Sequence, residues 1–168
     1  MSNDTLLAVV FWVLAGITLG SALMVSLVRD LVHAVLFLIL AFIGVSGIYI
    51  TLSADFVAVV QVLIYAGAIS VLMLFAILLT PTSARDNSPV SYRAPISVVA
   101  GMIGAIIVFV SVKTDWQTVT DARFDNTARE IGRALLDPYV LPFEVASVLL
   151  VIAMVGAIML VQPNRREE

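Results

Sequence analysis

The sequence predicts an all-α integral membrane bundle of five transmembrane helices. Of its 168 residues, 61% are hydrophobic and 12% are charged, against roughly 45–50% apolar and about 25% charged residues in a soluble domain. A domain this small could not bury so much apolar surface, because small proteins leave a large fraction of their surface exposed. Five apolar stretches have the length of roughly 17–25 residues that a helix needs to cross a bilayer. They lie at 6–28, 31–52, 56–79, 96–112 and 143–161.

The first three predicted spans are joined by very short links. No basic residue precedes the first stretch, and its apolar run exceeds the core of a signal peptide, so we interpret it as a retained membrane helix. Arg29 and Asp30 separate it from the second stretch, and residues 53–55 separate the second from the third. Such links make consecutive helices antiparallel neighbours. The next link is polar and contains three prolines, which predicts a loop.

The 113–141 link carries charges of both signs, and we expect it outside the membrane. Within it, Thr127 and Glu130 fit a capping box, in which a hydroxyl and a carboxylate satisfy backbone donors at a helix start. Asp137 and Pro138 would end this helix. Its apolar side chains share one face at helical spacing, at Ala128, Ile131 and Leu135. A short amphipathic helix on the membrane surface is predicted, with an ordinary exposed loop helix as the alternative.

Basic residues in short loops predict the orientation, because such loops stay in the cytoplasm. The N-terminus and the second link have none, which places the N-terminus outside and the C-terminus inside. The nearly charge-balanced 113–141 link is placed outside as well. The cytoplasmic signals are Arg29, Arg85, Arg93, Arg165 and Arg166.

Small residues at helical spacing predict close packing between spans, because membrane helices associate through such residues. These seams favour a packed bundle over a lone anchor. They are formed by Gly16 and Gly20, Gly44 and Gly47, Ala100 with Gly104, Gly101 with Ala105, and Ala153 with Ala157.

Several classes of function are disfavoured by what the sequence contains. With no cysteine and a single histidine, His33, the chain offers no disulfide, no thiolate-ligated iron–sulfur cluster, no His-pair metal site and no c-type haem attachment. The basic residues form no stripe, so nothing suggests nucleic acid. Charged side chains that could carry ions occur only at span edges, as Asp55 and Glu144. An autonomous transporter or enzyme is therefore disfavoured, because ion pathways usually place charges at mid-membrane.

The third stretch is the most informative. Gln61 and Tyr65 are four residues apart and share one helix face, whereas Ser70 is displaced from Tyr65 by about 140° in an α-helix. Tyr65 falls near the bilayer centre, away from the interfaces where tyrosine is usual. Gly67, flanked by Ala66 and Ala68, suits a π-bulge, a feature that recurs at functional sites. A functional site is one interpretation, and a polar pair satisfied by a neighbouring helix is the other.

Two segments carry a family resemblance. The stretch 54–75, from Ala-Asp-Phe-Val-Ala-Val-Val-Gln through Tyr-Ala-Gly-Ala to Phe75, resembles the third helix of the J subunit of the proton-pumping NADH:quinone oxidoreductase, respiratory complex I. The mitochondrial counterpart is NADH dehydrogenase subunit 6. The stretch 138–158, with Pro142, Glu144 and Gly156, resembles the family's last helix and its entry. The five-span layout and the long fourth link agree with the family.

The resemblance implies a membrane-arm subunit that couples quinone reduction to proton translocation. It implies contacts with the A, H, K and N subunits and lipid, an obligate hetero-oligomer, and a multi-pass location in the inner (plasma) membrane. NADH, FMN, iron–sulfur clusters and quinone belong to the parent complex, and this chain is expected to bind no cofactor and to hold no redox or catalytic centre.

The resemblance also assigns roles to residues of the third helix. Tyr65 would line a hydrated proton path, and Gly67 would permit a π-bulge that connects or breaks it. Asp55, Gln61 and Glu144 would be supporting polar groups. Some relatives carry an acidic residue near Gln61, and an amide cannot carry a proton, so Gln61 could only orient water.

Two alternatives within the membrane remain. One is a J-like subunit of a related cation/proton antiporter or hydrogenase complex. The other is a structural clamp that fills space between subunits, in which case the Tyr65 hydroxyl would matter only for stability.

Overall fold

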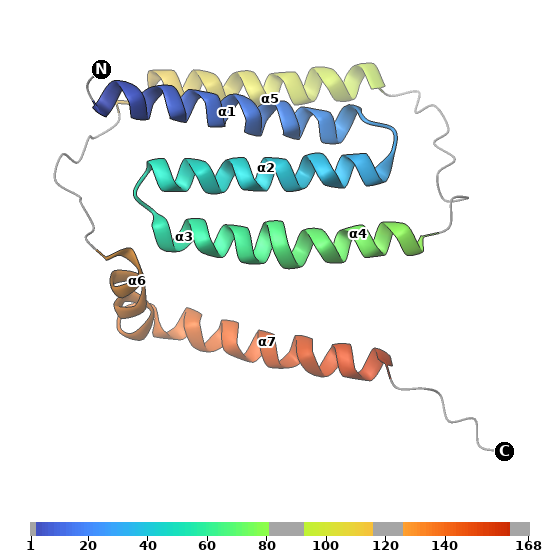
Figure 1. Ribbon diagram of the computed structural model, residues 1–168, viewed down its shortest axis with the longest axis vertical. Helices are drawn as coiled ribbons and strands as arrows, with labels where there is room; N and C mark the ends of the chain where they lie inside the picture. Colours follow the sequence, from blue (N-terminus) through green and yellow to red (C-terminus); the bar gives the residue numbers. More distant parts are fainter. Residues whose placement is uncertain (1–2, 81–92, 116–125, 162–168) are drawn as a thin grey trace.

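The computed structural model describes residues 3–80, 93–115 and 126–161, and its regular structure there is entirely helical (Figure 1). The third predicted span is one continuous rod built from three helical segments. The orientation signals at Arg85, Arg165 and Arg166 lie outside the described residues. The elements in order are α1 (Asn3–Leu27), α2 (Leu31–Thr51), α3 (Asp55–Val60), η1 (Gln61–Ile69), α4 (Ser70–Leu79), α5 (Arg93–Lys113), α6 (Thr127–Leu136) and α7 (Val140–Val161).

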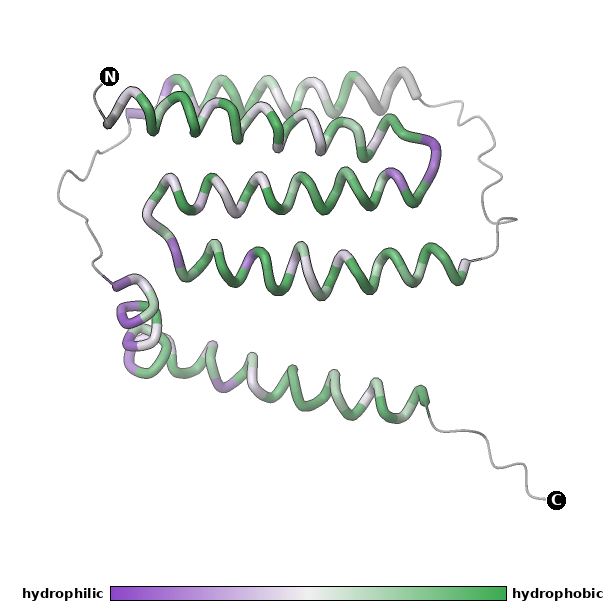
Figure 2. The backbone as a smooth tube through the Cα atoms, viewed as in Figure 1, coloured by the Kyte–Doolittle hydropathy of each residue, from purple (hydrophilic) through white to green (hydrophobic). Residues whose placement is uncertain are grey.

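The fold is an all-α membrane bundle, as the composition predicts. Four helical stretches are long and apolar enough to cross a bilayer, whereas the apolar part of α5 over Val98–Lys113 is shorter. Figure 2 shows the long helices as almost uniformly hydrophobic, with hydrophilic residues gathered at the links and on α6. The four stretches are Thr5–Leu27, Leu31–Thr51, Asp55–Leu79 and Val140–Val161.

The first three spans form one antiparallel layer, with α2 between α1 and the α3–η1–α4 rod (Figure 1). Glycine allows α1 and α2 to approach closely. A Cβ on Gly44 would lie 3.3 Å from Thr18 Cβ and collide with the Thr18 hydroxyl, and a Cβ on Gly47 would lie 2.9 Å from Leu14 Cδ2. The seam predicted at Gly44 and Gly47 is therefore confirmed within this chain.

The turns between these spans are fixed by local hydrogen bonds. The Asp30 carboxylate accepts from the Val32 N–H at 2.9 Å and so caps the start of α2. At the other end, Ser53 adopts a positive φ of 59°, and the Ala54 N–H donates to the Tyr49 carbonyl. This turn reverses the chain and starts the third span directly beside α2.

The remaining spans lie apart from this layer. Within the described residues, α5 makes no close backbone contact with another helix, and α7 contacts only α6. Almost every side chain of α5 and α7 that the structure describes is exposed. Their apolar surfaces must therefore face lipid or other membrane proteins, since exposing so much apolar surface to water is unfavourable.

The short helix α6 connects the two parts of the chain. It contacts α3 as well as α7, and it lies at the end of the layer where the third span begins (Figure 1). The predicted capping box is wrong, because Asn126 is the N-cap and its side chain accepts from the Arg129 N–H at 3.1 Å. Ala128 and Leu135 are exposed. The half-buried residues of α6 are instead Thr127, Ile131, Gly132 and Ala134, of which Thr127, Ile131 and Ala134 form a stripe along one face.

Candidate functional site

A π-helix interrupts the third span over Gln61–Ile69, nine residues long. π-Helices occur mostly as single-turn bulges inside α-helices, and these bulges are frequent at functional sites. Here the segment has ordinary α-helix on both sides, so the rod passes from α to π and back to α within one span. The predicted π-bulge is therefore present, and it includes both Tyr65 and Gly67.

Serine hydroxyls donate to backbone carbonyls near both ends of η1. Ser46 of α2 donates to the Ala58 carbonyl at 2.9 Å, just before η1 begins. Ser70, the residue after η1, donates to the Tyr65 carbonyl at 2.7 Å, and its backbone N–H donates to the same oxygen. Because no water is available in hydrocarbon, such donors stabilise carbonyls where the backbone register changes.

The Ser70 contact explains why α-helical geometry misplaced this residue. In an α-helix Ser70 would lie about 140° around the axis from Tyr65. In a π-helix the N–H of residue i+5 bonds the carbonyl of residue i, so Ser70 lies next to the Tyr65 carbonyl. Ser70 is 0% exposed, which makes it the most completely buried side chain of the site. The available signal in the sequence was a serine five residues after Tyr65, the spacing of a π-helical hydrogen bond rather than the four of an α-helix.

Tyr65 and Gln61 both lie toward α2 but in different environments. Gln61 is 9% exposed, whereas Tyr65 is 45% exposed. The Tyr65 ring packs edge-on against Phe42 of α2, with centroids 5.6 Å apart and planes at 68°. This geometry is favourable for aromatic pairs. The Tyr65 ring thus packs against α2, while nearly half of the side chain stays exposed and could contact a partner or water.

Gly67 provides space rather than an unusual backbone conformation. No described glycine has a positive φ. A Cβ at position 67 would lie 3.3 Å from the Val62 carbonyl oxygen, five residues earlier. The π register places this carbonyl next to residue 67. A separation of 3.3 Å is tighter than an ordinary contact, so a side chain at position 67 would require the Val62 carbonyl to shift by a few tenths of an ångström.

Asp55 opens the span and lines a groove that leads toward η1. The groove has a volume of about 370 Å³. Its lining is mostly apolar, with Asp55 and Ser46 as polar members. It extends from the start of α3 to the first residues of η1, and its walls are Ser46, Ile50, Asp55, Ala58, Val59, Val62 and Leu63.

Glu144 is not brought to this site. It lies in the first part of α7, and within the described residues α7 has no contact with α3, η1 or α4. The structure therefore groups Asp55, Gln61, Tyr65 and Gly67 on one rod and leaves Glu144 on a separate helix. The missed participants are Phe42 and Ser46, which lie on α2 and which pattern analysis of a single helix could not connect to η1. Ser70, on the same span, was noted in the sequence but not linked to the Tyr65 carbonyl.

The arrangement can perform a conformational task. Among the described residues, no cluster of three or more His, Cys, Asp or Glu side chains could hold a metal ion. What the site offers is a π-helix between two α-helical segments of one span, a hydroxyl and an amide on it, and a carboxylate at the start of the span. Conversion of one π-turn to an α-turn would rotate one half of the span by about 100° relative to the other.

Comparison with known proteins agrees with this architecture. Residues 21–160 match the family described as NADH-ubiquinone/plastoquinone oxidoreductase chain 6. The chain is 43% identical over 155 residues to NAD(P)H-quinone oxidoreductase chain 6 of Synechocystis sp., which covers 89% of this chain and 78% of the relative. It is 39% identical over 155 residues to F(420)H(2) dehydrogenase subunit J of Methanosarcina mazei, covering 89% and 87%.

A chloroplastic relative extends the match over a longer alignment. NAD(P)H-quinone oxidoreductase subunit 6 of Marchantia polymorpha is 35% identical over 168 residues, covering 92% of this chain and 87% of the relative. The matched region contains the π-helix and all of α2 to α6. The chain therefore belongs to the NADH-ubiquinone/plastoquinone oxidoreductase chain 6 family.

Proposed function

We propose that this chain is a membrane-arm subunit of a proton-pumping quinone oxidoreductase and couples quinone reduction to proton translocation by changing the register of η1. The observation that carries the proposal is the π-helix at Gln61–Ile69 within an otherwise α-helical span. Family membership supports the quinone oxidoreductase context. In the π register, water beside Tyr65 and Gln61 would continue a hydrated path, and in the α register the path would break.

The residues have distinct roles in this proposal. The Tyr65 hydroxyl lines the path and hydrogen-bonds its water. Gln61 orients water but relays no proton, since a side-chain amide does not change its protonation state at neutral pH. Asp55 is a polar group at the end of the span, and Gly67 leaves room for the register change. Glu144, on a helix separate from the rod, would support the path only through contacts with other subunits.

The surroundings follow from the same proposal. The chain is a multi-pass membrane protein, placed in the inner (plasma) membrane with the N-terminus outside and the C-terminus inside. Subunits of the A, H, K and N type, together with lipid, would cover the exposed faces of α5 and α7. NADH, FMN, iron–sulfur clusters and quinone would be held by the parent complex, and this chain would bind none of them.

The electron donor of the parent complex has a second candidate. One relative is named as a subunit of an F(420)H(2) dehydrogenase, and others as subunits of NAD(P)H-quinone oxidoreductases. The membrane site can serve either input, since electrons enter elsewhere in such a complex. Purifying the intact complex and assaying both donors would distinguish the two.

Substitution of Gly67 tests the coupling role. Gly67→Val places a β-branched side chain against the Val62 carbonyl, and overpacking typically costs about 1–3 kcal/mol. A shift of about 1.4 kcal/mol changes an equilibrium tenfold. We expect an assembled complex that reduces artificial acceptors normally but loses quinone reduction and pumping by about tenfold. Tyr65→Phe should give a milder loss of the same kind.

Gly104→Val is the matched control, because a Cβ at Gly104 has no neighbour within 4 Å in this chain. It makes the same change of side chain in another membrane helix. Normal pumping by a fully assembled Gly67→Val complex would leave the structural clamp as the better account.

A further inference from the structure

The outer end of the third span lacks a cap from its own sequence. The helix begins at Asp55, and the preceding residue, Ala54, makes no side-chain capping hydrogen bond. The first N–H groups of any helix have no acceptor within the helix. Here the Phe56 N–H donates to the Thr127 hydroxyl over a long distance of 3.4 Å. The acceptor comes from α6, 71 positions later in the chain.

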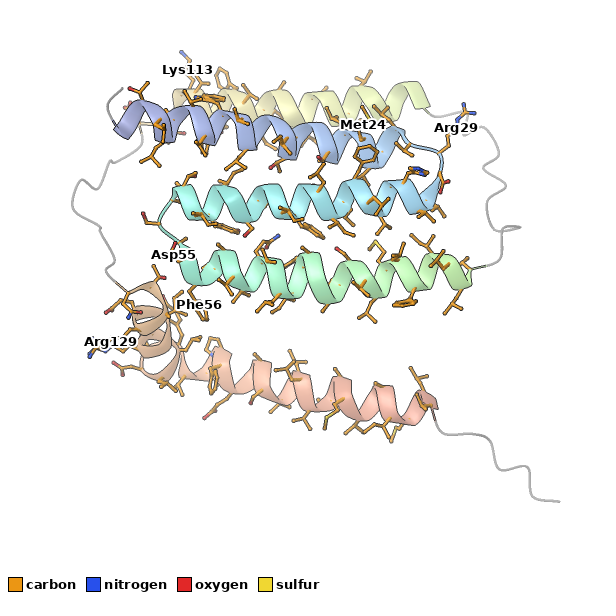
Figure 3. All side chains as sticks on the ribbon, in the orientation of Figure 1. Met24, Arg29, Asp55, Phe56, Lys113 and Arg129 are labelled. Atoms are coloured by element: carbon orange, nitrogen blue, oxygen red, sulfur yellow. The ribbon has the colours of Figure 1, made fainter. Side chains whose placement is uncertain are left out.

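Thr127 is available for this contact because its own helix is capped by another residue. Asn126 accepts from the Arg129 N–H at 3.1 Å. Glu130, which a capping box would turn back toward the helix start, instead lies 3.7 Å from Arg133. The Thr127 hydroxyl can therefore serve α3 rather than α6. In Figure 3, Phe56 and Asp55 lie at the end of the span that α6 adjoins.

Apolar contact accompanies the hydrogen bond. The half-buried stripe of α6, formed by Thr127, Ile131 and Ala134, faces the start of the third span. Between the two lies a groove of about 380 Å³. Its walls on the other side are Leu52, Ser53, Ala54 and Val57. The helix α6 thus rests on the entry to the rod through a polar contact and an apolar one.

The two halves of the rod differ in how they are held. The outer half, α3, bonds to α6 through Thr127 and to α2 through Ser46. In the described part of the inner half, the polar side chains Ser70 and Thr80 donate to carbonyls of their own span, at Tyr65 and Ala76. The side-chain hydrogen bonds that tie the rod to other helices therefore lie on the outer side of η1.

We propose that Thr127 is a positioning residue that holds the outer end of the third span against the extramembrane helix α6. With that end fixed, a register change in η1 turns the opposite half of the rod. Without this fixed end, the rotation is divided between both halves of the rod, and the half beyond η1 turns less. This inference rests on the proposed function for its consequence in pumping, but the contact itself can be measured separately.

The test compares Thr127→Val with Thr127→Ser in the assembled complex. Valine keeps the shape of threonine and removes the hydroxyl, whereas serine keeps the hydroxyl. Amide hydrogen exchange at the start of α3 should become about fivefold faster in Thr127→Val, the effect of losing one hydrogen bond. Proton pumping should fall by about twofold or more, and Thr127→Ser should restore both quantities.

Thr114→Val is the control, because the Thr114 hydroxyl donates to the Val110 carbonyl of its own helix. It should change neither quantity. If Thr127→Val fails to assemble, Ile131→Ala weakens the same contact from its apolar side and should shift exchange and pumping in the same direction.

Unchanged exchange in Thr127→Val would show that no anchor exists. Faster exchange with full pumping would show that the contact does not position the rod. Both outcomes overturn the inference. Failure of the proposed function gives a different pattern: Gly67→Val would then pump normally, whatever the exchange at α3 shows.

Discussion

Single hydroxyl groups determine how a π-helix can persist inside a membrane span. A change of backbone register leaves carbonyls whose usual donors have moved, and hydrocarbon provides no water to replace them. In this protein Ser46 and Ser70 provide donors on either side of the segment that contains Tyr65 and Gly67. The π-helix is therefore supported by side chains of two spans and not by the flexibility of glycine alone.

Removal of the Ser70 hydroxyl tests this support. Ser70→Ala leaves the Tyr65 carbonyl with one donor fewer, at a cost of about 0.5–1.5 kcal/mol. Amide exchange within Gln61–Ile69 should become several-fold faster in the assembled complex. Ser147→Ala is the control, because the Ser147 hydroxyl donates to the Glu144 carbonyl on α7. Equal exchange in wild type and Ser70→Ala would mean that the hydroxyl does not stabilise η1.

The π-bulge of this site was predictable from the sequence. Gly67 between two alanines, with a tyrosine at mid-membrane, indicated a π-bulge in the third span. The contacts to Phe42 and Ser46 were not predictable, because they depend on how α2 packs against the rod. Ser70 was set apart from Tyr65 because the α-helical period was applied to a segment whose hydrogen bonds span five residues.

Among the elements, the seam between α1 and α2 is the clearest case of packing through glycine. Gly44→Ala should destabilise it by about 1–3 kcal/mol, because the new Cβ meets Thr18. Gly16→Ala meets nothing within 4 Å in this chain, and replacement of a helical glycine by alanine gains about 0.5–1 kcal/mol. Thermal inactivation of the complex should therefore occur earlier in Gly44→Ala only. Equal midpoints for the two variants would contradict the seam.

The short helix α6 shows the limit of local patterns. A short helix ending at Asp137 was predictable from Asp137-Pro138 and the apolar spacing. The predicted cap and the predicted packed face were each misplaced by about one position. The sequence fits a cap at Thr127 nearly as well as one at Asn126, and a buried face at 128, 131 and 135 nearly as well as one at 127, 131 and 134. The choice between these alternatives depends on the packing of α6 against α3. Local patterns could not reveal it, because that contact joins residues 71 positions apart.

At the scale of the whole molecule, the described residues divide into a packed layer and two long helices, α5 and α7, that contact no other span. The layer of α1, α2 and the rod is predictable from short links, which make neighbours antiparallel. The positions of α5 and α7 are not, since other subunits would complete them in our proposal. The exposed apolar surface of these helices agrees with a chain that functions only in an assembly.

Orientation is testable at the same scale, because the chain contains no cysteine. Arg29 and Arg129 lie at opposite ends of the layer (Figure 3). We expect an impermeant thiol reagent to label Arg129→Cys from outside the cell and Arg29→Cys only in inverted vesicles. Labelling with the opposite sidedness would reverse the topology and move the α6 anchor to the cytoplasmic side.

The central claim is that the register of η1 governs proton translocation. The most direct measurement is the initial rate of proton uptake in inverted vesicles, per assembled complex, for Gly67→Val beside Gly104→Val. The account predicts a loss of about tenfold in Gly67→Val and a wild-type rate in Gly104→Val, with electron entry unchanged in both. Equal, wild-type rates in the two variants would contradict it.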